Sequence, residues 1–138
     1  MTGADGEAER TAAEEAAVQR LIRTLYPAAS VDGLRATAWF EPQPEHRGNP
    51  GWLQGGLAAT VLDHLCARAA SAALGDRVVT GTLELRYPRP VPIADGPFRV
   101  WAEAQEARGR MTRARGAIVD ADGRPMVEAK GLFLLRPG

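Results

Sequence analysis

Residues 54–75 read QGGLAATVLDHLCARAASAALG and form the most apolar helical pattern in the chain. Ala, Leu, Val and Cys occupy nearly every face of the helix that this pattern predicts, whereas a helix on a protein surface shows a single apolar stripe. We therefore expect a helix at Gly55–Leu74 that is enclosed by other structure. Gly75 is suited to end it, because glycine readily adopts the left-handed conformation that follows many helices.

The sequence after this helix is typical of β-strands. Alternating and β-branched runs predict strands at residues 77–87, 97–107, 111–120 and 125–135, and a further strand before the helix at residues 34–40. Three breaks, at Asp95-Gly96, Arg108-Gly109-Arg110 and Asp122-Gly123, have the spacing of hairpin turns. One long helix and five strands place the chain in the α+β class, as an antiparallel sheet wrapped around a central helix.

An extra N-terminal helix is predicted at residues 7–26, where good helix formers predominate. Its second half is expected to pack on the body through apolar side chains at helical spacing, while the part up to residue 17 is expected to fray. Those apolar side chains are Val18, Leu21, Ile22 and Leu25. The loop at residues 41–52 contains three prolines and two glycines, and we expect His46 within it to be solvated.

Composition narrows the function classes. The 138 residues suit a single domain, and 17 basic against 17 acidic residues, without a basic block, argue against nucleic acid as a partner. The N-terminus lacks the pattern of a secretory signal, and Cys66 is the only cysteine, so we expect a cytoplasmic protein that binds no membrane. The two histidines and the cysteine have no metal-binding spacing, so no metal is expected.

Two features of the long helix predict chemistry. Gly55 and Gly56 leave the first N–H groups of the helix uncovered by side chains, and such groups polarise carbonyl oxygens. The alternative is that the glycines only allow close packing or cap the helix. Asp63 lies among apolar residues, where an unpaired carboxylate is costly, and Arg68 at i+5 is poorly placed for an ion pair with it. We therefore expect Asp63 to be functional.

Helix geometry separates these two features. Eight residues at about 1.5 Å each place Gly55 and Asp63 roughly 12 Å apart along the axis, too far to serve one carbonyl. A general base must reach its water at hydrogen-bond distance, so we expect a homodimer in which Gly55 of one subunit meets Asp63 of the other across a two-fold axis. His64 points about 100° away from Asp63 and is expected to serve in packing or an interface.

Four stretches carry a resemblance to a known family: NPGWLQGGLAATVLD at residues 49–63, TGTLELRYPRP at residues 80–90, DADG at residues 120–123 and AKG at residues 129–131. Together they resemble the hotdog-fold acyl-CoA thioesterases of the phenylacetate-degradation type, within the 4-hydroxybenzoyl-CoA thioesterase superfamily. The resemblance implies a hotdog fold and hydrolysis of an acyl thioester, with the Gly55 amide polarising the thioester carbonyl. Asp63 would activate water from the opposite subunit.

The resemblance also implies roles for four neighbouring residues. The family's asparagine before the glycines corresponds to Asn49, and a hydroxyl that holds the water and the carboxylate corresponds to Thr80. Thr82, on the same face of the predicted strand, competes with Thr80 for that role. Many relatives carry histidine where this chain has Gln54, and a glutamine cannot titrate but can still donate hydrogen bonds.

The implied substrate is a small acyl thioester of coenzyme A, with no separate cofactor. Its acyl group is expected near Gly56, Trp52 and Leu65, and its phosphates near rim cations such as Arg89, Arg108, Arg110 or Arg113. The assembly is expected to be a homodimer or a dimer of dimers, that is, a homotetramer. Two other readings stay open: a non-catalytic protein that binds acyl-CoA or acyl-carrier protein, and a hotdog hydratase or dehydratase.

Overall fold

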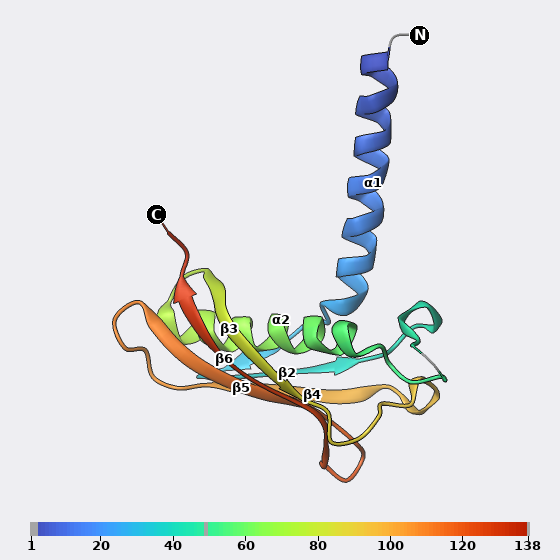
Figure 1. Cartoon of the computed structure of the whole chain (residues 1–138). Coiled ribbons are helices and arrows are strands. Elements are labelled where there is room, and N and C mark those ends of the chain that lie inside the picture. The colour runs from blue at the N-terminus through green and yellow to red at the C-terminus, as the bar shows by residue number, and fades with distance from the viewer. Residues whose placement is uncertain (1–2, 49, 138) are drawn as a thin grey trace.

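A six-stranded antiparallel sheet lies against one long helix in the computed structural model, which describes residues 3–48 and 50–137 (Figure 1). The elements are α1 (Gly3–Leu25), β1 (Ser30–Asp32), β2 (Arg35–Phe40), α2 (Gly55–Leu74), β3 (Val78–Arg86), β4 (Phe98–Ala104), β5 (Met111–Val119) and β6 (Pro125–Leu135), with short 3-10 helices at Pro44–His46 and Ile93–Asp95. The strand order is β1-β2-β4-β5-β6-β3. The predicted α+β class and the hotdog arrangement of sheet and helix are confirmed.

Helix α2 spans Gly55–Leu74 as predicted, and Gly75 ends it with a φ of 79°. The face that meets the sheet is buried and includes Val61, Leu62, Leu65, Cys66 and Ala69. The opposite face, which carries Asp63 and Arg68, is open or only half-buried. The expected enclosure is therefore met on one side only. The helix is long and apolar enough to cross a membrane, but it lies along the sheet as a core helix does.

Strand pairing differs from the prediction at one turn. The breaks at Gly109 and Gly123 do join hairpins, β4 with β5 and β5 with β6. The break at Asp95-Gly96 does not, because β3 pairs with β6 at the sheet edge while β4 pairs with β2 and β5. A local turn signal shows where the chain bends, but the next pairing partner depends on contacts distant in sequence. The chain therefore crosses from the β3 edge to the middle of the sheet.

Helix α1 stands away from the sheet and approaches it through its last turn (Figure 1). Leu25 is buried there, as predicted, whereas the side chains of Val18, Leu21 and Ile22 lie outside the described part of the structure. Both histidines of the chain contact this junction. His64 stacks on Tyr26 with ring centroids 4.3 Å apart, which agrees with the packing role expected of it.

The prediction that His46 is solvated is wrong, because its ring is fully buried beside Phe40. Its Nδ1 accepts a hydrogen bond from the N–H of Gln43 at 2.9 Å, so the ring proton sits on Nε2 and is donated to Thr24 Oγ1 at 3.0 Å. Burial lowers the pKa of His46, and the neighbouring Glu45 charge opposes this shift only partly. A loop residue is buried here because the end of α1 covers it.

Candidate active site

Asp63 lies on the open face of α2, where strand β3 runs beside the helix. Thr80 of β3 donates a hydrogen bond from Oγ1 to Asp63 Oδ1 at 2.7 Å. Within residues 3–48 and 50–137 no ion pair to Asp63 is formed, so the salt bridge to Arg68 that helix geometry disfavours is not made. One carboxylate oxygen is thus fixed by a hydroxyl, and the other is left to accept a proton from a water molecule.

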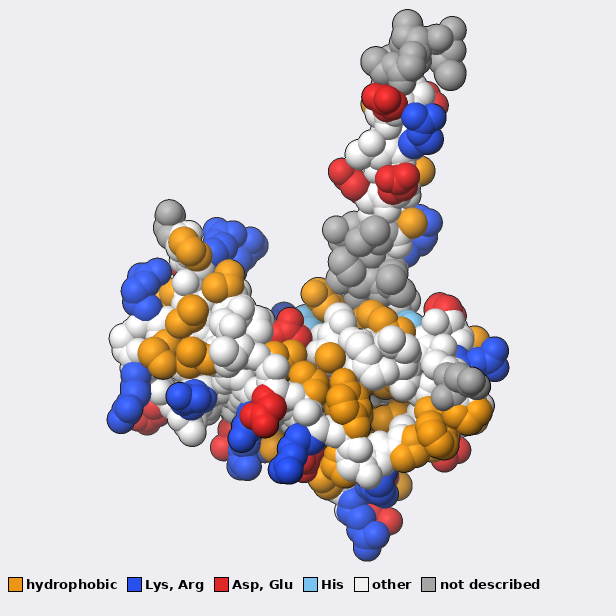
Figure 2. All heavy atoms as spheres, in the orientation of Figure 1, with side chains coloured by type: hydrophobic (Ala, Val, Ile, Leu, Met, Phe, Trp, Pro, Cys, Tyr) orange, Lys and Arg blue, Asp and Glu red, His pale blue; other side chains and the backbone are white. Residues whose placement is uncertain are grey.

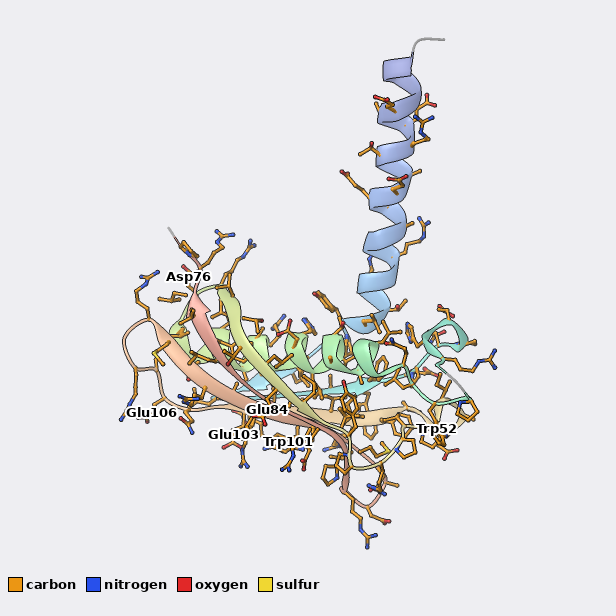
Figure 3. All side chains as sticks on the ribbon, in the orientation of Figure 1. Trp52, Asp76, Glu84, Trp101, Glu103 and Glu106 are labelled. Carbon is orange, nitrogen blue, oxygen red and sulfur yellow. The ribbon has the colours of Figure 1, made fainter. Side chains whose placement is uncertain are left out.

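Thr82 does not share a face with Thr80, in contrast to the prediction. Thr80 pairs with Phe133 and Thr82 pairs with its neighbour Leu132, so Gly81 forms a bulge that reverses the facing of the side chains. The Thr82 hydroxyl accepts a hydrogen bond from the N–H of Leu132 at 3.2 Å. Thr82 lines a hollow on the outer face of the sheet with Glu84 and Glu103, which Figure 3 labels on the side away from α2.

The first turn of α2 presents two free amide groups. Gln54 caps the helix, because its Oε1 accepts the N–H of Leu57 at 2.9 Å. In the described part of the chain, the N–H groups of Gly55 and Gly56 have no acceptor. A Cβ at Gly56 would lie 3.0 Å from the Gln54 amide oxygen, a close contact that favours glycine beside this cap. The cap occupies the oxygen of Gln54 and leaves its amide nitrogen as a donor.

Tyr87 supports the same turn and was not assigned a role from the sequence. Its hydroxyl donates a hydrogen bond to the carbonyl oxygen of Gly55 at 2.8 Å. Partial burial raises the pKa of Tyr87, which keeps the phenol protonated and able to donate. The sequence indicates such a role only through the position of Tyr87 in the 80–90 stretch, seven residues after Thr80. Tyr87, just after the end of β3, thus contacts Gly55, and Thr80, within β3, contacts Asp63.

The two parts of the site do not meet within one chain. Asp63 and Gly55 lie on the same straight helix eight residues apart, which is roughly 12 Å along its axis. Each has its own partner beside β3, namely Thr80 for Asp63 and Tyr87 for Gly55. Within this chain, the two groups that the sequence predicts to act on one carbonyl are therefore separate.

The other predicted substrate contacts are scattered. Asn49 lies outside the described residues. Trp52 is 46% exposed, and its backbone bridges to Pro92. Leu65, on the buried face of α2, is fully buried, so it belongs to the core and cannot line an open channel in the isolated chain. Of Trp52 and Leu65, Trp52 is therefore the one accessible to a ligand in the isolated chain.

Two of the arginines expected to bind phosphate, Arg89 and Arg110, have different surroundings. Arg89 forms an ion pair with Asp120 at 2.8 Å and donates to the carbonyl of Arg124 at 3.1 Å, so it anchors the β5–β6 turn. The pKa of Asp120 is lowered first by the N–H of Arg124 and then by Arg89. Arg110 lies at the start of β5, beside the end of β6, where its guanidinium contacts the carbonyl of Arg136 at 3.4 Å.

Metal and thiol chemistry find little support in the described residues. No group of three or more His, Cys, Asp or Glu side chains is placed there to hold a metal ion. Cys66 is fully buried against the sheet, and burial raises the pKa of its thiol to about 12. A thiol with that pKa is not a nucleophile at neutral pH. Asp63 and the amides of the first turn of α2 remain the groups with chemical potential.

Comparisons with known proteins identify the family of the chain. The model of the family described as the thioesterase superfamily matches residues 51–127. The chain is 29% identical over 104 residues to the acyl-coenzyme A thioesterase THEM4 of Bos taurus, covering 75% of this chain and 42% of that protein. It thus spans less than half the length of this curated relative.

Solved structures show the same fold. S. sahachiroi AziG superposes with a TM-score of 0.76 at 25% identity, over 85% of this chain and 97% of that one. A putative thioesterase of Ralstonia eutropha, related to phenylacetic acid degradation, superposes with a TM-score of 0.73 at 21% identity, over 84% of this chain and 89% of that one. The family predicted from the sequence is therefore confirmed. The chain belongs to the thioesterase superfamily.

Proposed function

We propose that the protein is an acyl-CoA hydrolase whose active sites form between two copies of the chain. The observation that carries this proposal is the Thr80–Asp63 hydrogen bond of 2.7 Å on an open face of α2, in a chain of the thioesterase superfamily. A carboxylate held by one hydroxyl and otherwise accessible is suited to take a proton from water. The name of the THEM4 relative indicates acyl-coenzyme A as the substrate class.

The reaction proceeds by attack of water on the thioester carbonyl. Asp63 accepts a proton from the water as its oxygen bonds to the carbonyl carbon, and the negative charge that develops on the carbonyl oxygen is stabilised by the N–H of Gly55. Loss of one such donor typically raises the activation barrier by about 2.7–4 kcal/mol, which lowers kcat about a hundredfold to a thousandfold. The tetrahedral intermediate then expels the CoA thiolate, which takes up the proton held by Asp63. The nitrogen of Gln54 offers a second donor in place of the family's histidine.

Two copies are required because of distance, and the surface of the chain supports their association. Strand β3 is an exposed edge strand, and an edge strand offers unpaired N–H and C=O groups to a second strand. On the face of α2 that carries Asp63, Ala59 and Ala67 have small side chains one turn to either side, which allow another helix to approach closely. A two-fold axis level with Ala59, midway between Gly55 and Asp63, completes two equivalent sites.

A complementation experiment tests both the chemistry and the assembly. Asp63→Asn removes the base, and Gly55→Pro removes the amide donor at the first helical position, where proline is well tolerated. The preceding Gln54 has φ −64° and ψ 133°, which is compatible with a following proline. We expect each variant alone to lose about a hundredfold or more in thiol release from acyl-CoA.

Refolding the two variants together should restore activity, because half of the dimers are then mixed and each mixed dimer has one intact site. The recovered rate should be about one quarter of that of the wild type. If the base and the amide acted within one chain, mixing would restore nothing, and the composite site would be wrong. A wild-type protein that binds acyl-CoA but releases no thiol would instead favour the non-catalytic binding protein.

A hydratase is not favoured by the described residues. Such an enzyme requires a histidine placed to exchange a proton with carbon beside the carboxylate, and His64 is instead stacked on Tyr26. Burial lowers the pKa of His64, a shift that a hydrogen bond with the backbone of Pro27 opposes. Its ring is therefore engaged with the end of α1 and not with Asp63.

A further inference from the structure

We propose that the phosphates of coenzyme A bind at a basic corner formed by Arg77, Arg110 and Arg136, at the end of the sheet where α2 terminates. This inference rests on the proposed function and adds the place where the nucleotide half of the substrate is recognised. Figure 2 shows Lys and Arg side chains gathered at this end of the molecule, close to the C-terminus.

The corner is built by backbone hydrogen bonds between three segments. The N–H of Arg136 donates to the carbonyl of Arg77 at 3.0 Å, and the N–H of Leu135 donates to the carbonyl of Arg110 at 2.9 Å. The Arg110 guanidinium also contacts the Arg136 carbonyl at 3.4 Å. The beginning of β3, the beginning of β5 and the end of β6 therefore bring three arginine positions together, although they are far apart in sequence.

The charge of the corner is not neutralised by the residues that the structure describes. All three arginines are exposed, and none of them forms an ion pair there, whereas Arg35, Arg89 and Lys130 elsewhere each pair with a carboxylate. The neighbouring acid, Asp76, uses its Oδ1 to accept the N–H of Arg77 at 2.7 Å (Figure 3). The net charge is positive, and guanidinium groups bind phosphate oxygens in paired hydrogen bonds.

The corner lies at the right distance from the base. Thr80, which hydrogen-bonds Asp63, follows Arg77 by three residues of extended strand, a distance of roughly 10 Å. The pantetheine arm contains about thirteen bonds between its sulfur and the first phosphorus, and at the reach of an extended backbone this is roughly 15 Å. A thioester held at Asp63 can thus place its diphosphate at the basic corner.

The opposite direction along α2 is unsuitable for phosphates. It runs from Asp63 toward Ala59 and the partner helix, where small apolar side chains are to be covered on association, and burying unpaired charge there is costly. Toward the corner, by contrast, the start of β3 leads from Thr80 through Val79, which is 40% exposed, to the exposed Arg77. The CoA arm therefore leaves toward the corner and the acyl group points inward.

The test compares two substrates that share an acyl group, the acyl-CoA and the acyl-pantetheine thioester that lacks the phosphates and the nucleotide. We expect the double variant Arg77→Gln/Arg136→Gln to lower kcat/KM for acyl-CoA at least about tenfold and to leave that for acyl-pantetheine within about twofold. The backbone bonds of both positions remain in this variant. Arg124→Gln, a charge loss in the β5–β6 turn, is the matched control and should change neither substrate.

The proposal is overturned if the double variant loses activity equally on both substrates, or if it loses activity on neither of them. It is also overturned if only hydrolysis of an acyl-carrier-protein thioester is impaired, because the corner would then recognise a protein. Calorimetry with free CoA separates this proposal from the hydrolase assignment. Binding weakened at least tenfold in the double variant supports the corner even in a protein that hydrolyses no thioester, and unchanged binding refutes it.

Discussion

Removing the hydroxyl of Thr80 tests the catalytic geometry most directly. The Thr80 hydroxyl donates to Asp63 Oδ1 at 2.7 Å, and a hydrogen bond to a charged group contributes about 1.5–3 kcal/mol. Both side chains reach solvent in the isolated chain, so we take the lower half of this range. At about 1.4 kcal/mol per tenfold change in rate, Thr80→Val should lower kcat roughly tenfold to fortyfold.

The assay is steady-state thiol release, with kcat and KM determined separately. Thr80 positions Asp63 and need not touch the acyl group, so KM should change less than kcat, and Thr80→Ser should restore most of the rate because it keeps the hydroxyl. Thr82→Val is the matched control, since that hydroxyl faces the other side of the sheet and bonds the N–H of Leu132. Equal losses in Thr80→Val and Thr82→Val, or an unchanged kcat in Thr80→Val, would refute the reasoning.

Other predictions concern the support of the site and the stability of the fold. Tyr87→Phe removes the hydrogen bond to the Gly55 carbonyl and should lower kcat about twofold to tenfold in the same assay, with no loss of folding by circular dichroism. Gly131→Ala places a Cβ against the carbonyl oxygen of Thr82 and should reduce the free energy of unfolding, measured with urea, by about 1–3 kcal/mol. Burial lowers the pKa of His46 below its usual 6.5, so as the pH falls the unfolded chain takes up this proton before the folded chain does. The free energy of unfolding should therefore be highest above about pH 6.5 and should decrease as the pH falls toward the pKa of His46 in the folded protein. The urea midpoint of the His46→Phe variant should therefore change less with pH than that of the wild type.

The limits of helix α2 and the positions of the strands could be predicted because their signals are local. The glycines at the start of α2 and Gly75 at its end are read from neighbouring residues, and both ends agree with the structure. The pairing of β3 could not be predicted in the same way. It follows from the placement of β6, some fifty residues away, and the turn at Asp95-Gly96 carries no information about it.

The candidate site shows the same division between local and distant information. Helix geometry alone separated Gly55 from Asp63, and the structure preserves that separation. The expectation that Thr82 shares the face of Thr80 was wrong, because the bulge at Gly81 reverses the facing of the side chains and a glycine in a strand does not reveal whether a bulge forms. The burial of His46 likewise depends on the end of α1, which packs over a loop twenty residues later.

A second chain would reconcile the sequence of α2 with its exposure. An apolar pattern on nearly every face predicts enclosure, yet among the described residues Asp63 has only β3 beside it, through the hydroxyl of Thr80, and remains partly exposed. The same face holds the proposed catalytic carboxylate and the small side chains that would admit another helix. Association and catalysis would therefore depend on one surface, because each chain gives its Gly55 to one site and its Asp63 to the other. A chain that folded without pairing would keep every catalytic residue and possess no complete site.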